Sequence, residues 1–190
     1  MAIVYYQIKS DIYSDFGVTR NPRLPPSASF IKGVRILDPL PRPIPFEVNY
    51  PDQPPHLVGN TIAVISEQLR QALQSMAIDN FEAFPATLRN PTTGAEWTDY
   101  WAFNVLGLVA AAHATSSTDT VIPANNEGVR TPLLGFRTLV LDKQKTQDLS
   151  MFRLAESPST LLIHKRVLEA LRANKPQGGW RFSSVAIDCV

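Results

Sequence analysis

The sequence is short of cysteine, of charge and of long apolar runs, and each shortage excludes a class of protein. Its 190 residues include one cysteine, Cys189, which excludes an internal disulfide and a zinc site built on cysteines. Charged residues are 18% of the chain, below the about 25% of average domains, and 9% are aromatic, which is untypical of a disordered chain. The composition predicts a globular protein, and the length predicts a single domain over 1–190.

No apolar run is long enough to cross a membrane. The longest, residues 102–114, is interrupted by Asn104 and His113 and is shorter than the about 20 residues of a spanning helix. Residues 1–9 carry neither a basic leader nor a small-residue cleavage site, so we expect no secretory signal. These patterns favour a cytoplasmic protein with no membrane partner.

Charge is nearly balanced overall but unevenly spread. The net charge is +1, with +1 over 1–60, −4 over 61–142 and +4 over 143–190. The basic residues of the last segment are interleaved with acidic ones, and the isoelectric point of about 7.9 lies below the ~9 typical of nucleic-acid-binding domains. We therefore expect no nucleic acid among the partners.

Proline organises the N-terminal segment, 1–60. Residues 3–8 have the apolar, β-branched and aromatic composition of a strand. Ten prolines between Pro22 and Pro55 then exclude a regular helix or a central strand, and predict an extended wrapping segment with one short strand at 33–37. Apolar residues between the prolines favour a strap packed on the core over a polyproline ligand for another domain. These are Phe30, Ile31, Ile36, Leu37, Leu40, Ile44, Phe46 and Val48.

The segment 61–142 begins with a strand and a helix. Residues 61–65 are strand-like, and Ser66 is a candidate N-cap with Glu67 in the first helical turn. Apolar residues then follow at helical spacing as far as Met76. We expect a helix of about three turns after Ser66.

A hairpin and a loop complete this segment. The hairpin spans 81–105 and turns at 90–94, and Pro85 predicts that its first strand lies at an edge or carries a bulge. Residues 106–114 fit a strand or a helix, because an apolar run without alternation is compatible with both. The polar residues 114–131 predict a long loop.

The segment 143–190 repeats the order of the preceding one. Residues 162–171 align with 64–73 at a constant offset of 98 residues, which pairs Ile65 with Ile163. Amphipathic helices share such patterns by chance, so a duplication is a hypothesis. The fold predicted for the whole chain is α+β, with mixed or mainly antiparallel sheets, two principal helices and two similar strand–helix–strand halves.

Residues that could carry chemistry are scattered. His56, His113 and His164 stand alone, at no spacing that binds a metal. His164 takes the place of Ser66 in the repeat, which predicts a residue at a helix start. No nucleophile motif surrounds residues 116–117. We expect no catalytic residue, no metal site and no cofactor.

Several short motifs nevertheless resemble a known family. They are the helix opening at 64–66, Tyr100-x-x-x-Asn104, a serine-containing loop near Ser116, and the segments 139–142, 151–154, 162–172 and 178–182. Together they make residues 57–187 similar to the myxobacterial-type immunity-protein family of bacterial polymorphic toxin systems. One departure is Ala112-His113, at a place where such proteins commonly carry an acidic residue.

The resemblance implies a small cytoplasmic protein, encoded beside a large modular toxin, that protects the producing cell by binding the cognate toxin domain. The family offers no defined catalytic residues. A partner-binding protein needs an interface with a few aromatic or arginine anchors. Candidates in the acidic segment are Glu96, Trp97, Asp99 and Trp101 of the hairpin, and Asp119 and Glu127 of the long loop.

The two tryptophans have a second interpretation. In a regular strand Trp97, Asp99 and Trp101 point to one face, and an Asp between two Trp is unlike a plain core stripe. Two core tryptophans beside an edge carboxylate fit the same pattern equally well.

Net charge also limits the expected toxin. An inhibitor that plugs the basic groove of a nuclease gains affinity from a strongly acidic surface, which a chain of net charge +1 lacks. We expect a target other than a highly basic nuclease, or an inhibitor that binds away from the active site. Two alternatives stay open: an enzyme or small-ligand binder with 114–131 as a lid, and a scaffold in a larger assembly.

Overall fold

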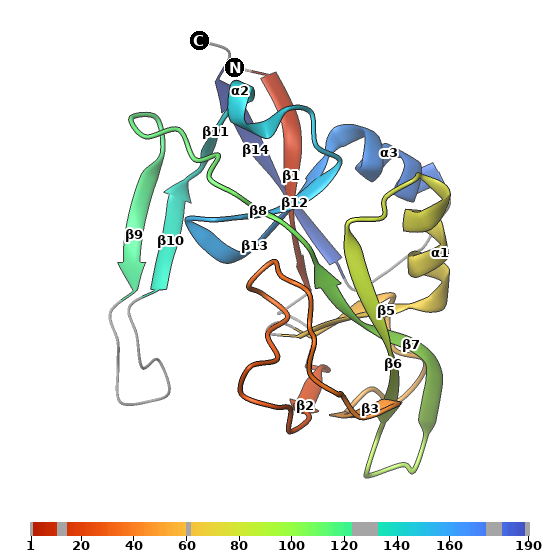
Figure 1. The fold of residues 1–190 in the computed structure, drawn as a ribbon. Helices are drawn as coiled ribbons and strands as arrows, with labels where there is room; N and C mark the ends of the chain where they lie inside the picture. Colours follow the sequence, from red (N-terminus) through yellow and green to blue (C-terminus); the bar gives the residue numbers. More distant parts are fainter. Residues whose placement is uncertain (1, 11–14, 60–61, 123–132, 174–179, 189–190) are drawn as a thin grey trace.

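The computed structural model describes the whole chain except residues 1, 11–14, 60–61, 123–132, 174–179 and 189–190. Fourteen strands and three helices follow one another along the described residues (Figure 1). They are β1 (Ala2–Ser10), β2 (Val18–Arg20), β3 (Ile44–Val48), β4 (Leu57–Val58), β5 (Ala63–Ser66), α1 (Glu67–Ser75), β6 (Phe81–Arg89), β7 (Glu96–Val105), β8 (Leu108–Val109), β9 (Thr118–Ile122), β10 (Leu133–Thr138), β11 (Val140–Asp142), α2 (Lys143–Thr146), β12 (Met151–Leu154), β13 (Ser157–His164), α3 (Lys165–Ala173) and β14 (Trp180–Asp188).

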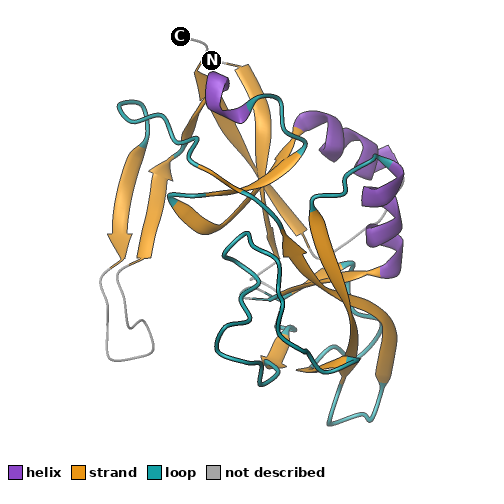
Figure 2. Cartoon of the chain, viewed as in Figure 1, coloured by secondary structure: helices purple, strands orange, loops and turns teal. Residues whose placement is uncertain are grey.

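The strands form two six-stranded sheets and a hairpin. Sheet A has the order β11-β14-β1-β13-β12-β8, sheet B has the order β2-β3-β6-β7-β5-β4, and β9 pairs with β10. Parallel pairs (β11 with β14, β12 with β8, β3 with β6) occur in both sheets among antiparallel ones. Figure 2 shows the longer helices, α1 and α3, gathered at one side of the sheets. The predicted α+β fold with mixed, mainly antiparallel sheets is confirmed.

The first helix begins as the sequence predicts. Ser66 has extended backbone dihedrals, and its Oγ accepts a hydrogen bond from the Leu69 N–H, the geometry of an N-cap. The apolar residues Leu69 and Leu73 are buried on one face of the helix. The chain leaves the helix at Met76, and Ala77 takes a left-handed φ of 55°.

The predicted halves share one supersecondary unit. The bounds of α1 and α3 lie 98 residues apart at both ends, and each helix starts directly after a strand, β5 or β13. Each helix then leads to a strand that runs parallel to the first, β6 or β14, with one antiparallel strand between the two. Both units are therefore β-α-β units split by an inserted strand.

The inserted strand has a different origin in each unit. In the first unit it is β7, which follows β6 directly, whereas in the second it is β1, from the other end of the chain. The equivalence extends to side chains: Tyr100 pairs with Ser66 in β5, and Tyr5 pairs with His164 in β13. Tyr5 and Tyr100 are 0% and 1% exposed and have the two largest fully buried side chains among the described residues.

Three apolar clusters hold these layers together. A central cluster joins α1 and α3 to the inner sides of both sheets through residues such as Leu69, Val167, Phe103 and Ile163. A second cluster lies between sheet B and the proline-rich strap, and a third lies on the other side of sheet A around Phe152. The two halves thus meet in the central cluster.

The proline-rich segment buries some of its apolar residues and exposes others. Phe30, Ile44 and Phe46 of the segment are 3%, 0% and 1% exposed, but Leu37 is 90% exposed. The predicted strand at 33–37 is absent, and the segment instead contributes β3, which lies between β2 and β6. A proline tolerates this inner position because β2 pairs only with the end of β3, so Pro45 meets β6 alone.

Two expectations for the middle segment also change. The strand with Pro85 is neither at an edge nor bulged: β6 lies between β3 and β7, and the extra residue of the hairpin lies in its partner β7. Residues 106–114 form no helix: Gly107 takes a φ of 93°, and the short β8 carries the chain from sheet B to sheet A.

The predicted loop 114–131 is present at residues 114–117 but wrong at 118–122. Residues 118–122 form β9, which pairs antiparallel with β10, while residues 123–131 lie outside the described part. The four β-branched residues among Thr118–Ile122 favour a strand. The Ser and Asn residues of the same polar segment led instead to the prediction of a loop. In Figure 1 the β9–β10 hairpin stands beside the rest of the molecule.

Candidate functional site

The strap, α1 and β7 surround a pocket of about 500 Å³, called here the Asp99 pocket. This volume falls within the range of about 300–1,000 Å³ found for ligand pockets. The lining residues are mostly polar, and Asp99 is the one carboxylate among them. They are Gln53, Pro54, Pro55, His56, Ser66, Gln68, Asp99 and Tyr100.

Hydrogen bonds fix the wall of the pocket. The Tyr100 hydroxyl donates to the Pro54 carbonyl and accepts from Gln53 Nε2 at 3.1 Å. On the other side, the Ser66 N–H donates to the His56 carbonyl at 3.0 Å, and His56 Nδ1 lies 2.7 Å from Ser66 Oγ. Burial raises the pKa of Tyr100 to about 12, which keeps this hydroxyl a donor at neutral pH.

Ser66, His56 and Asp99 have the composition of a serine hydrolase triad, but not its geometry. The Oγ of Ser66 belongs to a residue that is 3% exposed and already caps α1. Asp99 interacts with His56 electrostatically, and no hydrogen bond joins the two side chains among the described residues. A nucleophile needs a reachable oxygen and an oriented base, and this arrangement supplies neither.

Beside the pocket, Arg70 of α1 lies over Trp101 of β7. The guanidinium carbon is 4.6 Å from the centre of the indole ring, within the range of a cation–π contact. Glu67 also binds the guanidinium, with Arg70 Nη2 and Nε at 2.6 and 2.7 Å from its two carboxylate oxygens. The Arg70 hydrogen bonds lower the pKa of Glu67, and a hydrogen bond from Trp101 adds to the effect.

The structure separates the two predicted tryptophans. Leu88 pairs with Trp97 and Ala86 with Tyr100, so β7 has one residue more than β6 across this stretch. This bulge reverses the alternation, and Trp97 packs on the strap cluster while Trp101 packs on the central cluster with α1. The prediction that both point to one face is therefore wrong. Both are half-buried, as the core interpretation requires.

The other predicted site residues lie apart. Exposed Asp99 lines the Asp99 pocket, whereas exposed Glu96 lies in a second pocket of about 500 Å³ beside Arg89. The backbone of Asp119 pairs with Phe136 in the β9–β10 hairpin. Glu127 lies outside the described residues.

The strap and helix residues of this region escaped the sequence analysis. Gln53 and His56 come from the proline-rich segment, and Arg70 comes from a helix face that had been assigned only by its apolar residues. Their proximity to β7 depends on how the strap crosses sheet B, which no local pattern encodes. The local signal in the sequence that pointed to this region was Ser66, because its N-cap pattern predicted that a helix begins at the next residue.

Comparison with known protein families shows which family the chain resembles. The model described as "Immunity protein family (Imm11)" matches residues 28–186, most of the chain. The chain belongs to this immunity-protein family. The comparison with curated proteins gives no match.

In this immunity protein, the Tyr100-x-x-x-Asn104 motif fastens the strap to sheet B. Tyr100 binds the Pro54 carbonyl, and Asn104 Nδ2 donates to the Val34 carbonyl at 2.9 Å and to Glu82 at 3.0 Å. Glu82 in turn accepts from the Ile36 N–H at 3.1 Å. The motif residues thus have a structural role that their spacing on β7 explains.

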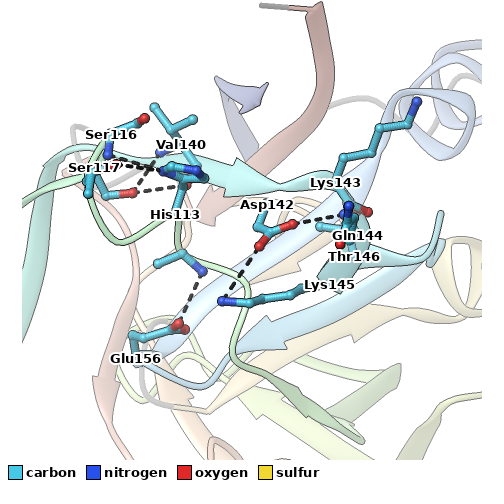
Figure 3. A network of polar contacts seen from close by, with 12 residues as sticks. His113, Ser116, Ser117, Val140, Asp142, Lys143, Gln144, Lys145, Thr146 and Glu156 are labelled. Carbon is cyan, nitrogen blue, oxygen red and sulfur yellow. Dashed lines mark hydrogen bonds and ion pairs between the residues drawn. The ribbon is translucent and has the colours of Figure 1, made fainter. Parts of the chain in front are cut away.

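A polar network of the same immunity protein surrounds the departure at Ala112-His113 (Figure 3). A carboxylate lies there after all, because Glu156 Oε1 accepts from the Ala112 N–H at 3.1 Å. His113 Nδ1 accepts from the Ser116 N–H at 3.3 Å, and Ser117 Oγ bonds both backbone groups of Val140, at 2.9 and 3.2 Å. The network ties the segment between β8 and β9 to β11.

The described residues offer neither a metal cluster nor a membrane-spanning helix. Within them, no group of three or more His, Cys, Asp or Glu side chains is placed to hold a metal ion. In the same part of the chain, no helix combines the length and the apolar character needed to cross a membrane.

Proposed function

We propose that this member of the immunity-protein family acts in the cytoplasm, where it binds a cognate toxin domain encoded nearby and neutralises it without catalysing a reaction. The observation that carries the proposal is the family match over residues 28–186. Binding of this kind needs a rigid scaffold that presents a few strong anchors.

The surface formed by α1 and β7, called here the α1–β7 surface, meets that need. It presents Arg70 stacked on Trp101 and fixed by Glu67, with the Asp99 pocket beside it. Trp and Arg are the residue types most enriched among interface hot spots. Because Glu67 already holds Arg70 in place, little side-chain entropy is lost when a partner covers the pair.

Of the sequence-predicted binding residues, Asp99 and Trp101 belong to this region. Glu96 and Trp97 lie elsewhere on sheet B, and Asp119 and Glu127 stay predictions for a separate contact. The proposed interface therefore centres on α1 and adds Arg70 to the predicted set.

Co-expression with the adjacent toxin domain tests the proposal. Cells that carry the toxin domain should survive only with this protein, and the two chains should co-purify. Replacing both anchors, Arg70→Ala with Trp101→Ala, should abolish co-purification while a matched exposed arginine on the other helix, Arg172→Ala, should leave it intact. Survival that is independent of this protein, or equal loss in both variants, would contradict the proposal.

A second candidate function rests on the 2.7 Å contact between His56 and Ser66 in the Asp99 pocket. If the chain is an enzyme that uses this pair, Ser66→Ala should remove the protection while the complex still forms. We expect the variant to protect fully at a temperature where it stays folded, because the hydroxyl acts as a helix cap.

A further inference from the structure

The Asp99 pocket has an unusual charge balance. Most of its polar groups are hydrogen-bonded to one another. Tyr100 bonds to Pro54 and Gln53, and Ser66 bonds to His56. Asp99 alone brings a formal negative charge, and it takes part in none of the ion pairs or hydrogen bonds recorded among the described residues. The pocket thus holds one exposed carboxylate among neutral walls.

Two features of the pocket act in opposite directions on the charge of a ligand: one favours an anion, and the other favours a cation. The N-terminus of α1 faces this region and would favour an anion. The first-turn N–H of Leu69 is already bonded to Ser66 Oγ, however, so it is not free to bind an anion. With Asp99 in the wall as well, an anion would meet repulsion. The balance therefore selects a cation.

The walls also limit the shape of the cation. Pro54 and Pro55 contribute apolar ring surface, while Gln53 and Gln68 contribute amide groups. This combination suits a side chain with an aliphatic stem and a charged, hydrogen-bonding end, such as lysine or arginine. The hydrogen bonds that fix the wall mean that little ordering is needed when the side chain enters.

We propose that the Asp99 pocket receives a lysine or arginine side chain of the toxin domain, which inserts beside the Arg70–Trp101 stack and pairs with the Asp99 carboxylate. The proposal rests on the proposed function, and it adds the chemistry of the group that the toxin must present. It also assigns Asp99 a separate role from its neighbours: Trp101 and Arg70 anchor the contact, and Asp99 selects the charge of what enters.

Calorimetric titration of the full chain with the adjacent toxin domain, made inactive, tests the pairing. The Asp99→Asn variant keeps the shape and removes the charge, and we expect its affinity to fall about tenfold. Glu96→Gln, which changes another exposed carboxylate on the same strand, is the matched control and should stay within about twofold of the unsubstituted protein. Thermal melts should show both variants folded.

A double-mutant cycle identifies the partner residue. Each lysine or arginine of the toxin domain is replaced by glutamine in turn, and one replacement should weaken binding to the unsubstituted protein but not to Asp99→Asn. The inference is overturned if Asp99→Asn binds as the unsubstituted protein does, if Glu96→Gln loses as much, or if no toxin residue couples to Asp99.

Failure of the proposed function gives a different result, because the unsubstituted protein then does not bind the toxin domain at all. The pocket is judged in that case with small probes by NMR. N-acetyl-arginine amide should shift the backbone resonances of Gln68 and Asp99 in the unsubstituted protein and not in Asp99→Asn. Shifts with N-acetyl-aspartate amide instead, or with neither probe, would overturn the assignment of a cation site.

Discussion

Arg153 is a buried charge without a carboxylate partner among the described residues. It is 4% exposed, its Nη1 donates to the Pro158 carbonyl at 3.0 Å, and its Nε has no partner in the described part of the chain. Burial lowers the pKa of Arg153 to about 10. The desolvation of the guanidinium is therefore only partly compensated.

Replacing Arg153 by methionine should not destabilise the protein. A well-packed apolar side chain of similar length avoids the desolvation cost, so we expect the free energy of unfolding to stay level or to rise by about 1–2 kcal/mol. Urea unfolding measures this, with Arg172→Met on the exposed side of α3 as the control, expected to change it by less than about 0.5 kcal/mol. A decrease in the free energy of unfolding by more than about 1 kcal/mol would show that Arg153 stabilises the fold by more than its hydrogen bond to Pro158 accounts for.

His56 makes stability depend on pH. Burial lowers the pKa of His56 below its ordinary 6.5, although the nearby Asp99 carboxylate acts in the opposite direction, and burial also lowers the pKa of His164. Above the unfolded-state pKa both forms of the protein hold neutral histidines. Below the unfolded-state pKa, the histidines of the unfolded chain become protonated while those of the native state stay neutral. The free energy of unfolding therefore decreases as the pH falls.

The free energy of unfolding should therefore be lower at a pH of about 5.5 than at about 7.5. The His56→Gln variant should show a smaller decrease, and adding His164→Gln should reduce it further. Urea unfolding at the two pH values tests both steps, and NMR titration of the ring protons measures each pKa directly. A His56 pKa above 6.5 in the folded protein would refute the expected direction.

Among the elements, the proline-rich strap contributes side chains to the core in spite of its irregular backbone. Phe46 of the strap is 1% exposed, whereas Leu37 of the same segment is 90% exposed. Phe46→Ala should lower the free energy of unfolding by about 3–5 kcal/mol, and Leu37→Ala should change it by less than about 0.5 kcal/mol. Equal effects in urea unfolding would mean that the strap is held by its backbone contacts instead of by burial.

The elements show how far the sequence alone predicts the structure. Helix α1, its cap at Ser66 and the β6–β7 hairpin follow from local signals: side-chain spacing, an N-cap residue and turn composition. The bulge in β7 does not, because one extra residue between Trp97 and Tyr100 leaves the amino-acid pattern unchanged while it reverses the faces. That single residue separates the predicted site into two parts.

The Asp99 pocket shows the same limit for the site. The sequence offered Asp99 and Trp101, both on one strand, as candidates for the site, but it pointed to neither His56 nor Arg70. Strap residues reach β7 through long-range hydrogen bonds such as Tyr100 to Pro54, which are 46 positions apart. Contacts of this separation are a property of the topology, and no window of sequence reports them.

At the scale of the whole molecule, the two split β-α-β units are interlocked. The inserted strand of the second unit is β1, which lies between β13 and β14 in sheet A although 146 residues separate Ser10 from Ser157. The second unit is therefore complete only when β1 pairs with β13 and β14, which are far from it in the sequence. Both helices then pack on the central cluster, so the proposed α1–β7 surface is joined to the second unit through the core.

The overall charge predicts how binding to the toxin should respond to salt. A net charge of +1 gives no strong acidic field, so long-range attraction contributes little, and the single pairing at Asp99 is the main charged contact of the proposed interface. Between about 0.05 and about 0.5 M NaCl we expect the affinity to fall less than about fivefold. The Asp99→Asn variant should show a still smaller decrease, because it lacks the charge that salt screens. A fall of several hundredfold in calorimetric titrations would instead indicate that many charges act together, as when an inhibitor plugs the basic groove of a nuclease, and would move the interface away from the α1–β7 surface.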